Sequence, residues 1–500
     1  MKSLITMLQK RKRIFNTMKK RIIALLLLAI MLFSVCSCIR SGVKYDYNMK
    51  KYITVGDYKG LDLQIPLDDI QYTIDTEIMA FATEYEVRDG DYVYVDITVT
   101  EVKYIDKGDG TLIDQRGEVY TDLEEKDMLL KIGSFDYSAR VEQSIVGTKI
   151  GETTKLKTTL PSTFKVEEYQ GREVYVDITV KSKPCVLGDV IAVEFDGYYL
   201  DKDGKRIPNP DKKTENDNEY KTFVEASKAA FYLGAKAAID GFEDAIVGMK
   251  IGETKTVQID IPEDYYFEEV RGQKAEFVIT AKEAYTAPVF DETFVATYRD
   301  YINDYYLDYR KYKTYKTTDD LINDLKHEYI LEKIFESIES TIEISKYPRI
   351  EYKDAMKELK DMEATFEKTY GTTLDKYLDA SFGQTREEYV KSNMKLEMIY
   401  YYIAQTEGIT PTAEELLAET DTLISYYKNL YMVNNNLDEA KAKEQALGLV
   451  DSLGSSYVYE NAMYKKVDDF LIKSSKVTYL DRTYESITDK IAAENKPVEK

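Results

Sequence analysis

One phrase of this chain is written twice, and it predicts a duplicated domain. Residues 145–153 read Ile-Val-Gly-Thr-Lys-Ile-Gly-Glu-Thr, and residues 246–254 read Ile-Val-Gly-Met-Lys-Ile-Gly-Glu-Thr. The flanks repeat in the same order, with a Gly-Asp pair before an early apolar run and a glycine turn before a late one. Landmarks displaced by roughly 100 residues are too far apart for a solenoid, whose units run about 20–50 residues. We therefore expect two copies of one β-rich domain.

Both copies carry the alternating pattern of half-buried strands, as at residues 92–97 and 256–261. In the second copy, residues 238–247 have the spacing of a short helix that Gly248 ends. Polar insertions at residues 106–110 and 201–220 interrupt the copies. Neither insertion has the full ligand series of a calcium loop with its closing Glu, so we expect hairpin turns there.

The N-terminus has the parts of an export signal. Lys19-Lys20-Arg21 precedes Ile22–Phe33, an apolar run that is too short to span a bilayer comfortably. The following Val35-Cys36-Ser37-Cys38 resembles a bacterial lipobox, and Met18 is an alternative start of the same signal. This pattern predicts a lipoprotein signal peptide over residues 1–37, with an ordinary signal peptide and incidental cysteines as the alternative.

A lipobox implies lipidation of Cys38, and residues 38–50 would then form a tether. An acylated cysteine holds a protein at a membrane without a spanning helix. The expected location is therefore the extracytoplasmic face of the cell membrane, reached through a lipid anchor. Cys185 would remain without a cysteine partner, so no disulfide framework is expected.

The composition excludes several classes of function. With 90 Asp and Glu against 68 Lys and Arg, the formal net charge is −22, which argues against nucleic acid as a partner. The one histidine, His327, lies in a polar helical stretch and is predicted to be on the surface. A Ser-His-Asp or Cys-His centre would have to use it. No CxxC, HExxH, Walker or Rossmann pattern is present, so no metal site and no cofactor is predicted.

The remaining segments are assigned by their periodicity. Residues 51–88 form a lead-in, with helical spacing over 69–85. From residue 287 to residue 485 the apolar pattern has the helical period, and Thr410-Pro411 is expected to open a helix after Gly408. Residues 486–500 form a charged tail.

The second copy resembles a known family. Residues 187–283 are similar to an FKBP-type peptidyl-prolyl isomerase domain, in the version found within bacterial trigger factor. The resemblance rests on Val193–Gly197, Phe231–Gly234, Ile239–Asp244, Gly248–Glu253 and Pro262–Tyr265, with Gly272 and Phe277. Weaker similarity extends over most of residues 51–480, including Tyr457–Thr478, which looks like the last helix of the trigger-factor chaperone domain.

This resemblance implies an α+β fold. Two tandem FKBP-like antiparallel β domains, residues 89–183 and 184–286, would be followed by an all-α trigger-factor/SurA-like chaperone domain over residues 287–485. Together with the lipid anchor expected from the lipobox, it implies a membrane-anchored foldase that isomerises X–Pro bonds and holds unfolded or nascent exported polypeptides. The ribosome-docking part of trigger factor is missing, so no ribosome is expected as a partner. The alternative is a non-catalytic chaperone or binding lipoprotein with the same fold.

The resemblance also places the site. It implies catalytic roles for Phe195, Ile239, Phe242, Phe267 and Phe277, and substrate-binding roles for Ile207 and Phe231. A plain apolar core remains the alternative for these side chains. Pro208 falls near the position of a family acid. The first copy has Arg140-Val141 in place of Gly241-Phe242 and Ile97 in place of Phe195, which indicates a degenerate copy that binds weakly or acts as a spacer.

Overall fold

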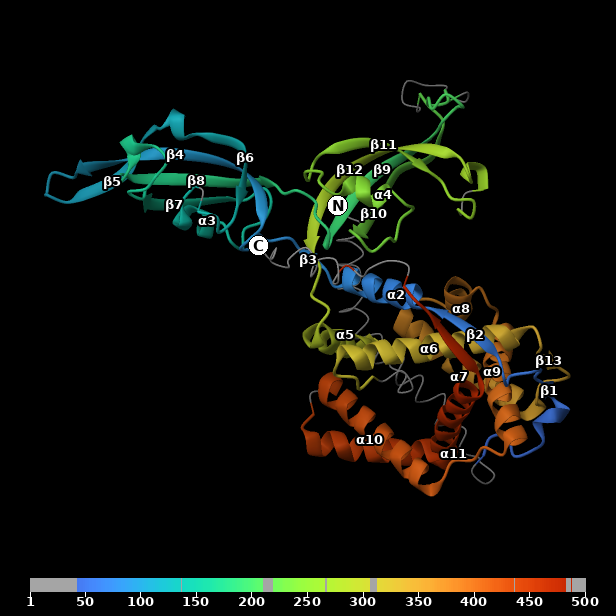
Figure 1. Ribbon diagram of the computed structural model, residues 1–500. Helices are drawn as coiled ribbons and strands as arrows, with labels where there is room; N and C mark the ends of the chain where they lie inside the picture. Colours follow the sequence, from blue (N-terminus) through green and yellow to red (C-terminus); the bar gives the residue numbers. More distant parts are fainter. Residues whose placement is uncertain are drawn as a thin grey trace. The chain divides into compact units, whose positions relative to one another are not determined.

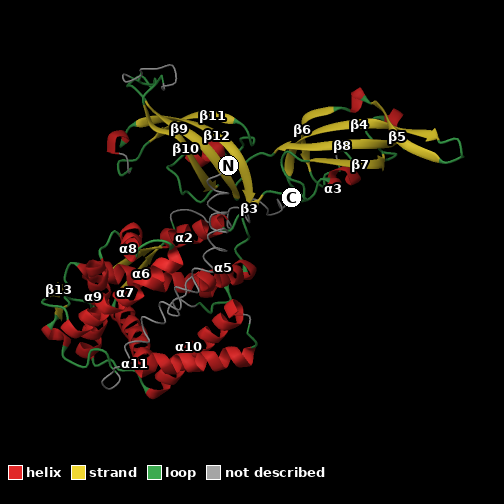
Figure 2. Cartoon of the chain, turned by 180° about the vertical axis from the view of Figure 1, so that it is seen from behind, coloured by secondary structure: helices red, strands yellow, loops and turns green. Residues whose placement is uncertain are grey.

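The computed structural model describes residues 43–135, 137–209, 219–265, 268–305, 313–435, 437–482 and 487. The chain divides into two compact units, and each is described by itself. Gln71–Val289 form the β unit, and the described residues up to Ile70 together with Phe290–Thr483 form the helical unit. Figure 2 shows this division by secondary structure. The expected signal peptide, Cys38 and all of the expected tail except residue 487 lie outside the described residues.

The first repeat, residues 89–183, contains a five-stranded antiparallel sheet. Its strands are β4 (Tyr92–Asp106), β5 (Leu112–Val119), β6 (Glu125–Lys131), β7 (Thr153–Thr159) and β8 (Glu173–Ser182). The order is β5-β4-β8-β7, and β6 pairs with the beginning of β4. Alternate residues of the two central strands are fully buried, because a strand points successive side chains to opposite faces: Val93, Val95, Ile97, Val99, Val174, Val176, Ile178 and Val180. Helix α3 (Ala139–Ser144) adds Val141 to this core.

The second repeat, residues 184–286, has the same central arrangement (Figure 1). Its strands are β9 (Asp189–Tyr199), β10 (Thr222–Tyr232), β11 (Thr254–Asp260) and β12 (Lys274–Thr286), in the order β10-β9-β12-β11. In each repeat the first and last strands pair at the centre, with Ile97 opposite Ile178 and Phe195 opposite Ile279. Helix α4 (Phe242–Ile246) follows β10. The short strand β3 (Thr83–Glu84) pairs with the end of β12.

Residues 106–110 and 201–205 form hairpin turns, as expected, and residues 210–218 of the second insertion lie outside the described residues. Asp106 Oδ1 accepts the N–H groups of Gly108 and Gly110 at 2.8 and 3.2 Å. Asp201 Oδ1 accepts the N–H groups of Asp203 and Lys205, each at 2.9 Å. Asp side chains favour such turns because they can bond the backbone two residues further on.

The repeated phrase forms the same turn in both repeats. Gly151 donates its N–H to Val180 O at 2.7 Å, and Gly252 donates to Ala281 O at 2.7 Å. These two glycines have φ values of +92° and +95°, which L side chains rarely adopt. The shared phrase therefore encodes the same backbone turn between the helix and the sheet in both repeats.

The helical unit contains seven long or medium helices among its described residues. They are α5 (Glu292–Tyr305), α6 (Thr318–Glu339), α7 (Arg349–Tyr370), α8 (Leu374–Phe382), α9 (Arg386–Glu407), α10 (Ala413–Asn435) and α11 (Glu439–Ser474). Two small sheets complete it: β1 (Ile53–Thr54) with β13 (Glu343–Ile344), and β2 (Asp62–Pro66) parallel to β14 (Lys476–Leu480). Its fully buried core includes Ile334, Ile338, Met398, Ile403, Met463 and Leu471. His327 lies exposed on α6, as predicted.

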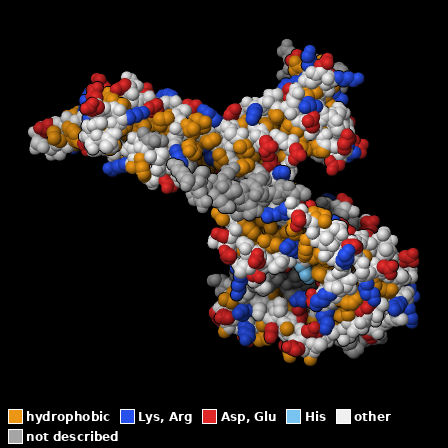
Figure 3. Space-filling view, viewed as in Figure 1, with side chains coloured by type: hydrophobic (Ala, Val, Ile, Leu, Met, Phe, Trp, Pro, Cys, Tyr) orange, Lys and Arg blue, Asp and Glu red, His pale blue; other side chains and the backbone are white. Residues whose placement is uncertain are grey.

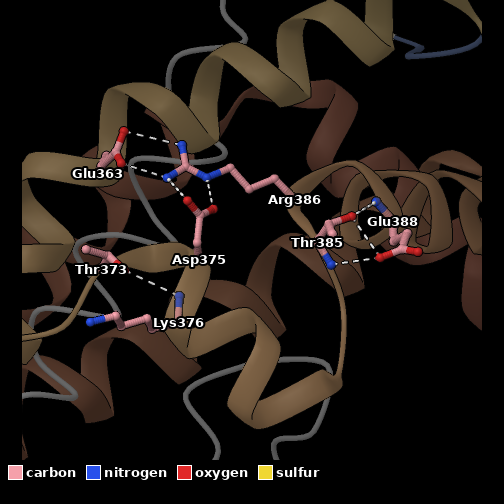
Figure 4. A network of polar contacts seen from close by, with 7 residues as sticks. All are labelled: Glu363, Thr373, Asp375, Lys376, Thr385, Arg386 and Glu388. Carbon is pink, nitrogen blue, oxygen red and sulfur yellow. Dashed lines mark hydrogen bonds and ion pairs between the residues drawn. The ribbon is translucent and has the colours of Figure 1, made fainter.

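An arginine joins three of these helices. The Arg386 guanidinium at the start of α9 lies between Glu363 of α7 and Asp375 of α8 (Figure 4). Its Nη2 is 2.7 Å from Glu363 Oε1 and 3.1 Å from Asp375 Oδ2. The guanidinium holds the pKa of Glu363 below its usual range. Beside it, Thr385 and Glu388 form a capping box that fixes where α9 begins.

Two helix boundaries differ from the sequence prediction because tertiary contacts end the helices. The helix expected over residues 69–85 is α2 (Leu67–Ala80), with Ile70, Ile74 and Ile78 buried as predicted. It ends early because Thr83–Glu84 leave it to pair with β12. Similarly, Lys476–Thr478 do not continue α11 but pair with β2.

Two helix starts also differ from the prediction. Helix α10 is capped by Thr412, whose Oγ1 accepts Glu415 N–H at 3.2 Å, and not by Thr410. Helix α4 starts at Phe242, four residues later than the spacing predicted, because Gly241 has a φ of +87° that a helix cannot include.

Candidate active site

Four phenylalanines from separate elements meet in the second repeat. Phe195 lies on β9, Phe231 on β10, Phe277 on β12, and Phe242 is the first residue of α4. The Phe242 ring centroid is 5.1 Å from that of Phe195, 5.2 Å from Phe231 and 5.2 Å from Phe277. Interplanar angles of 73° to Phe195 and 86° to Phe277 give the edge-to-face contacts that aromatic pairs favour.

We call this cluster of four rings the cup. Phe242 and Phe277, which are 3% and 1% exposed, form its floor, and the partly buried Phe195 and Phe231 form its rim. Ile207 and Ile239 are also partly buried and pack against the larger apolar core to which these rings belong. The structure thus brings together four of the seven residues proposed from the resemblance. The seventh, Phe267, lies outside the described residues.

The sequence prediction missed Phe223 of β10. Its ring is 5.6 Å from Phe277 and 5.4 Å from Tyr199. A Cβ on Gly197 would lie 2.6 Å from Phe223 Cζ, so only glycine leaves room for this ring. The signal was present in the Phe-Asp-Gly of residues 195–197, because a glycine inside a strand often marks a close approach.

A buried carboxylate shapes the loop that leads into the cup. Glu243 follows Phe242 and is 7% exposed. Its two oxygens accept backbone N–H groups at 2.7 to 3.2 Å from Gly234, Lys236, Ala237 and Ala238. Four donors offset the cost of burying the charge. They also fix the loop just before Ile239. In the sequence analysis, Glu243 contributed only to the family resemblance, as part of Ile239–Asp244, and no structural role was predicted for it.

The first repeat has the same carboxylate but no cup. Glu142 accepts N–H groups from Gly133, Phe135 and Tyr137 at 2.9 to 3.1 Å, as Glu243 does in the second repeat. The floor position of Phe242 is taken by Val141, one residue before that glutamate.

The first repeat has smaller side chains at the positions of the floor rings. Val176 pairs with Val99 as Phe277 pairs with Gly197, so the second floor ring is also replaced by a valine. Two aromatic side chains of the loops, Tyr137 and Phe164, pack edge to face at 5.6 Å and are 4% and 2% exposed. That the first copy is degenerate, as Arg140-Val141 and Ile97 indicate, stays a prediction.

The four rings of the cup are apolar and carry no titratable group. The Tyr199 phenol, whose ring lies 5.4 Å from that of Phe223, donates to Glu269 Oε2 at 2.6 Å. Burial together with this bond raises the pKa of Tyr199 to about 12. Such a site can bind an apolar ring and exclude water. It is not equipped for proton transfer by these residues.

Residues 181–283 match the family model of the FKBP-type peptidyl-prolyl cis-trans isomerase. The second repeat is an FKBP-type domain. Its boundaries in the match contain the whole cup, from β9 to nearly the end of β12. That the first repeat is also FKBP-like stays a prediction from the internal duplication.

The chain is also similar to trigger factors over a longer stretch than the family model covers. It is 27% identical over 330 residues to the trigger factor of Caldicellulosiruptor saccharolyticus, which covers 62% of this chain and 64% of the relative. It is 27% identical over 320 residues to that of Thermoanaerobacter pseudethanolicus, covering 60% and 64%. The chain thus spans less than two thirds of the length of these relatives.

Two solved structures share 14% sequence identity with the chain. One, described as "Promiscuous Substrate Recognition in Folding and Assembly Activities of the Trigger Factor Chaperone", covers 67% of this chain and 82% of its own, with a TM-score of 0.17. The other contains the three FKBP domains of wheat FKBP73 and covers 48% and 98%, with a TM-score of 0.14.

Proposed function

We propose that this protein is a membrane-anchored foldase on the extracytoplasmic side. Its FKBP-type domain would catalyse cis–trans isomerisation of X–Pro bonds, and its helical unit would hold unfolded exported polypeptides. The observation that carries the proposal is the cup around Phe242, with a buried floor and a partly exposed rim.

The chemistry needs no reactive group. Rotation about a prolyl amide faces a barrier of about 18–20 kcal/mol, which arises from resonance in the planar form. The prolyl ring would lie on Phe242, with Phe195 and Phe231 beside it. Resonance separates charge in the planar amide, so an apolar and water-free cup disfavours that form relative to the twisted one. The cup therefore favours the transition state over the bound substrate.

The helical unit has exposed apolar side chains suited to weak binding of unfolded chains. Ile350, Phe382, Leu417 and Leu447 are 65%, 53%, 68% and 41% exposed, and they lie on four different helices. Figure 3 shows acidic and basic side chains interspersed over the visible surface.

The location rests on the sequence alone. The basic segment, the short apolar run and the lipobox ending at Cys38 support export and lipidation. Among the described residues, no helix combines the length and apolar character needed to cross a bilayer. Cys185, the free cysteine of the described residues, is buried.

One observation favours a non-catalytic chaperone as the second candidate. Pro208, near the position of a family acid, bridges to Tyr220 and brings no polar side chain to the rim. A site without that polar group could bind prolyl segments and release them without acceleration.

Exchange spectroscopy of a prolyl peptide with the full-length protein separates the two candidates. We expect the wild type to accelerate isomerisation and Phe242→Ala to lose at least tenfold in kcat/KM. Val141→Ala, at the matching position of the first repeat, is the control and is expected to keep the wild-type rate. If the wild type does not accelerate isomerisation of the peptide, the second candidate, a non-catalytic chaperone, is correct. Membrane fractionation of the wild type against Cys38→Ser tests the anchor.

A further inference from the structure

The described part of the expected tether, from Val43 onward, is packed against the helical unit. Tyr45 and Met49 are 1% and 0% exposed, while Asp46 and Asn48 between them are exposed. Alternate side chains from Tyr45 to Met49 therefore turn toward the helical unit, and a short 3₁₀ helix, η1 (Met49–Lys51), begins at Met49. Residues 43–52, here called the anchor segment, therefore belong to the fold.

Side chains hold the anchor segment to α9. The Tyr45 hydroxyl donates to Glu397 Oε2 at 2.8 Å, and Lys44 Nζ lies 2.9 Å from Glu397 Oε1. The Tyr45 ring packs edge to face on Tyr401 with centroids 4.9 Å apart. Burial, with the Glu397 carboxylate beside it, raises the pKa of the Tyr45 phenol well above its ordinary value, so the hydroxyl keeps its proton.

The backbone of the segment is held as well. Gln405 of α9 accepts Met49 N–H on its Oε1 at 2.9 Å. Its Nε2 donates to Tyr45 O and Tyr47 O at 3.3 and 3.1 Å. One amide side chain thus bonds three backbone groups of the segment. Directly afterwards, Ile53 and Thr54 pair with β13.

We infer that the anchor segment holds the helical unit against the membrane surface, with the middle of α9 on the membrane side. This placement rests on the lipidation of Cys38 in the proposed function. Between Cys38 and Val43 the sequence has only Ile39, Arg40, Ser41 and Gly42. Five Cα–Cα steps therefore join Cys38 to Val43, and at about 3.4 Å each they reach no more than about 17 Å.

The consequence is an upper limit on the distance between the helical unit and the bilayer. A tether that continued freely to residue 50 would have roughly three times as many residues, since it would add eight to the four. With the anchor segment packed, Val43 at its beginning lies within about 17 Å of the lipid attachment point. An emerging polypeptide would then meet the helical unit next to the membrane.

Energy transfer tests this placement on the full lipidated protein. A donor dye is placed on Asp46→Cys, and the acceptor is a headgroup-labelled lipid in vesicles of phosphatidylglycerol and phosphatidylethanolamine. Cys185 does not compete for the dye, because burial raises its pKa to about 12. We expect a twelve-residue Gly-Ser insertion between Gly42 and Val43 to reduce the transfer efficiency at least twofold. The same insertion between Asp481 and Arg482 is the control and should change nothing.

Hydrogen exchange tests the packing independently of the lipid. In wild type and in Cys38→Ser, the Met49 amide should exchange at least a hundredfold more slowly than in an unfolded peptide, and Tyr45→Ala should accelerate it. Unprotected Met49, or equal transfer with and without the insertion at Gly42, would overturn the inference. Failure of the wild type to bind vesicles would overturn the membrane placement together with the anchor of the proposed function, whereas fast exchange in a vesicle-bound protein would overturn the packing alone.

Discussion

Phe242 and Glu243 are neighbours in the chain whose side chains stabilise different parts of the FKBP-type domain. The Phe242 ring contacts three other phenylalanines at 5.1 to 5.2 Å, and the Glu243 carboxylate accepts four backbone N–H groups of the preceding loop. Two consecutive residues therefore connect the floor of the cup to the loop that carries Ile239. Disturbing the carboxylate should disturb the cup.

We expect Glu243→Gln to lower the free energy of unfolding of the FKBP-type domain by about 1–3 kcal/mol. An amide has one acceptor oxygen, and its NH₂ would face backbone donors. Urea unfolding followed by circular dichroism measures the loss, and prolyl turnover should fall with it. Glu142→Gln is the matched control, expected to destabilise the first repeat and leave turnover unchanged. Equal turnover in both variants would show that the Glu243 loop does not shape the cup.

Gly241→Ala tests the backbone before the floor ring. Gly241 has a φ of +87°, and an added Cβ would meet no heavy atom within 4 Å. The cost is therefore conformational, about 1 kcal/mol. Gly448 lies within α11 without a positive φ and with equally open space, so Gly448→Ala should stabilise by about 0.5–1 kcal/mol. Denaturation midpoints that move in the same direction would contradict this explanation.

Tyr137→Phe should leave the stability of the first repeat unchanged or raise it by about 1 kcal/mol. Its hydroxyl is buried, and none of the described residues gives it a hydrogen-bond partner. Removing an unsatisfied buried polar group removes a desolvation cost. In contrast, Tyr85→Phe loses a 2.7 Å bond to Asp91 Oδ2 and should destabilise. Thermal unfolding of the two variants is the comparison, and a large loss for Tyr137→Phe would mean that the hydroxyl is satisfied.

Asp468 predicts a pH dependence in the helical unit. Burial raises the pKa of its carboxyl to about 6, while a 2.7 Å bond from the Tyr400 hydroxyl acts in the opposite direction. The unfolded value is about 3.9, so between about pH 4 and pH 6 the folded state holds a proton that the unfolded state releases. This contribution to stability is therefore present below about pH 4 and is lost as the pH rises to 6.

Asp468→Asn should remove that loss. We expect the variant to be about 1–3 kcal/mol more stable than wild type at pH 7.5 and nearly equal to it at pH 4. The measurement is urea unfolding at both pH values. Asp469→Asn is the control at the exposed neighbouring carboxylate, 3.8 Å from Lys473, and should change stability little at either pH. A difference from wild type that is the same at pH 4 and pH 7.5 would assign the effect to packing.

Local patterns predicted much of the fold. The alternation of apolar and polar residues predicted the central strands of both repeats, because a half-buried strand buries every second side chain. Ile70, Ile74 and Ile78 gave the buried face of α2. The helix ends were not predictable in the same way, because β3 and β14 form only when a partner strand arrives from far along the chain.

The site was predicted in part. The resemblance named seven residues, and four of them, Phe195, Phe231, Phe242 and Phe277, meet in one ring cluster. Phe223 was missed because Gly197, the residue that leaves room for its ring, lies on a different strand and far away in the sequence. The anchor segment was missed for the same reason: Tyr45, Tyr47 and Met49 alternate with polar residues over too few positions to stand out, and the surface that buries them is α9.

The sequence by itself determined that one β domain occurs twice, because the repeated phrase encodes a turn with two glycines at positive φ, and such backbone requirements are local. Only the tertiary structure decided which side chains meet inside each repeat. In the second repeat, the buried rings of Phe242 and Phe277 meet the partly exposed rings of Phe195 and Phe231. In the first, Tyr137 and Phe164 from two loops are buried against each other. That outcome depends on how volumes from distant segments fill one interior, and the local pattern does not contain it.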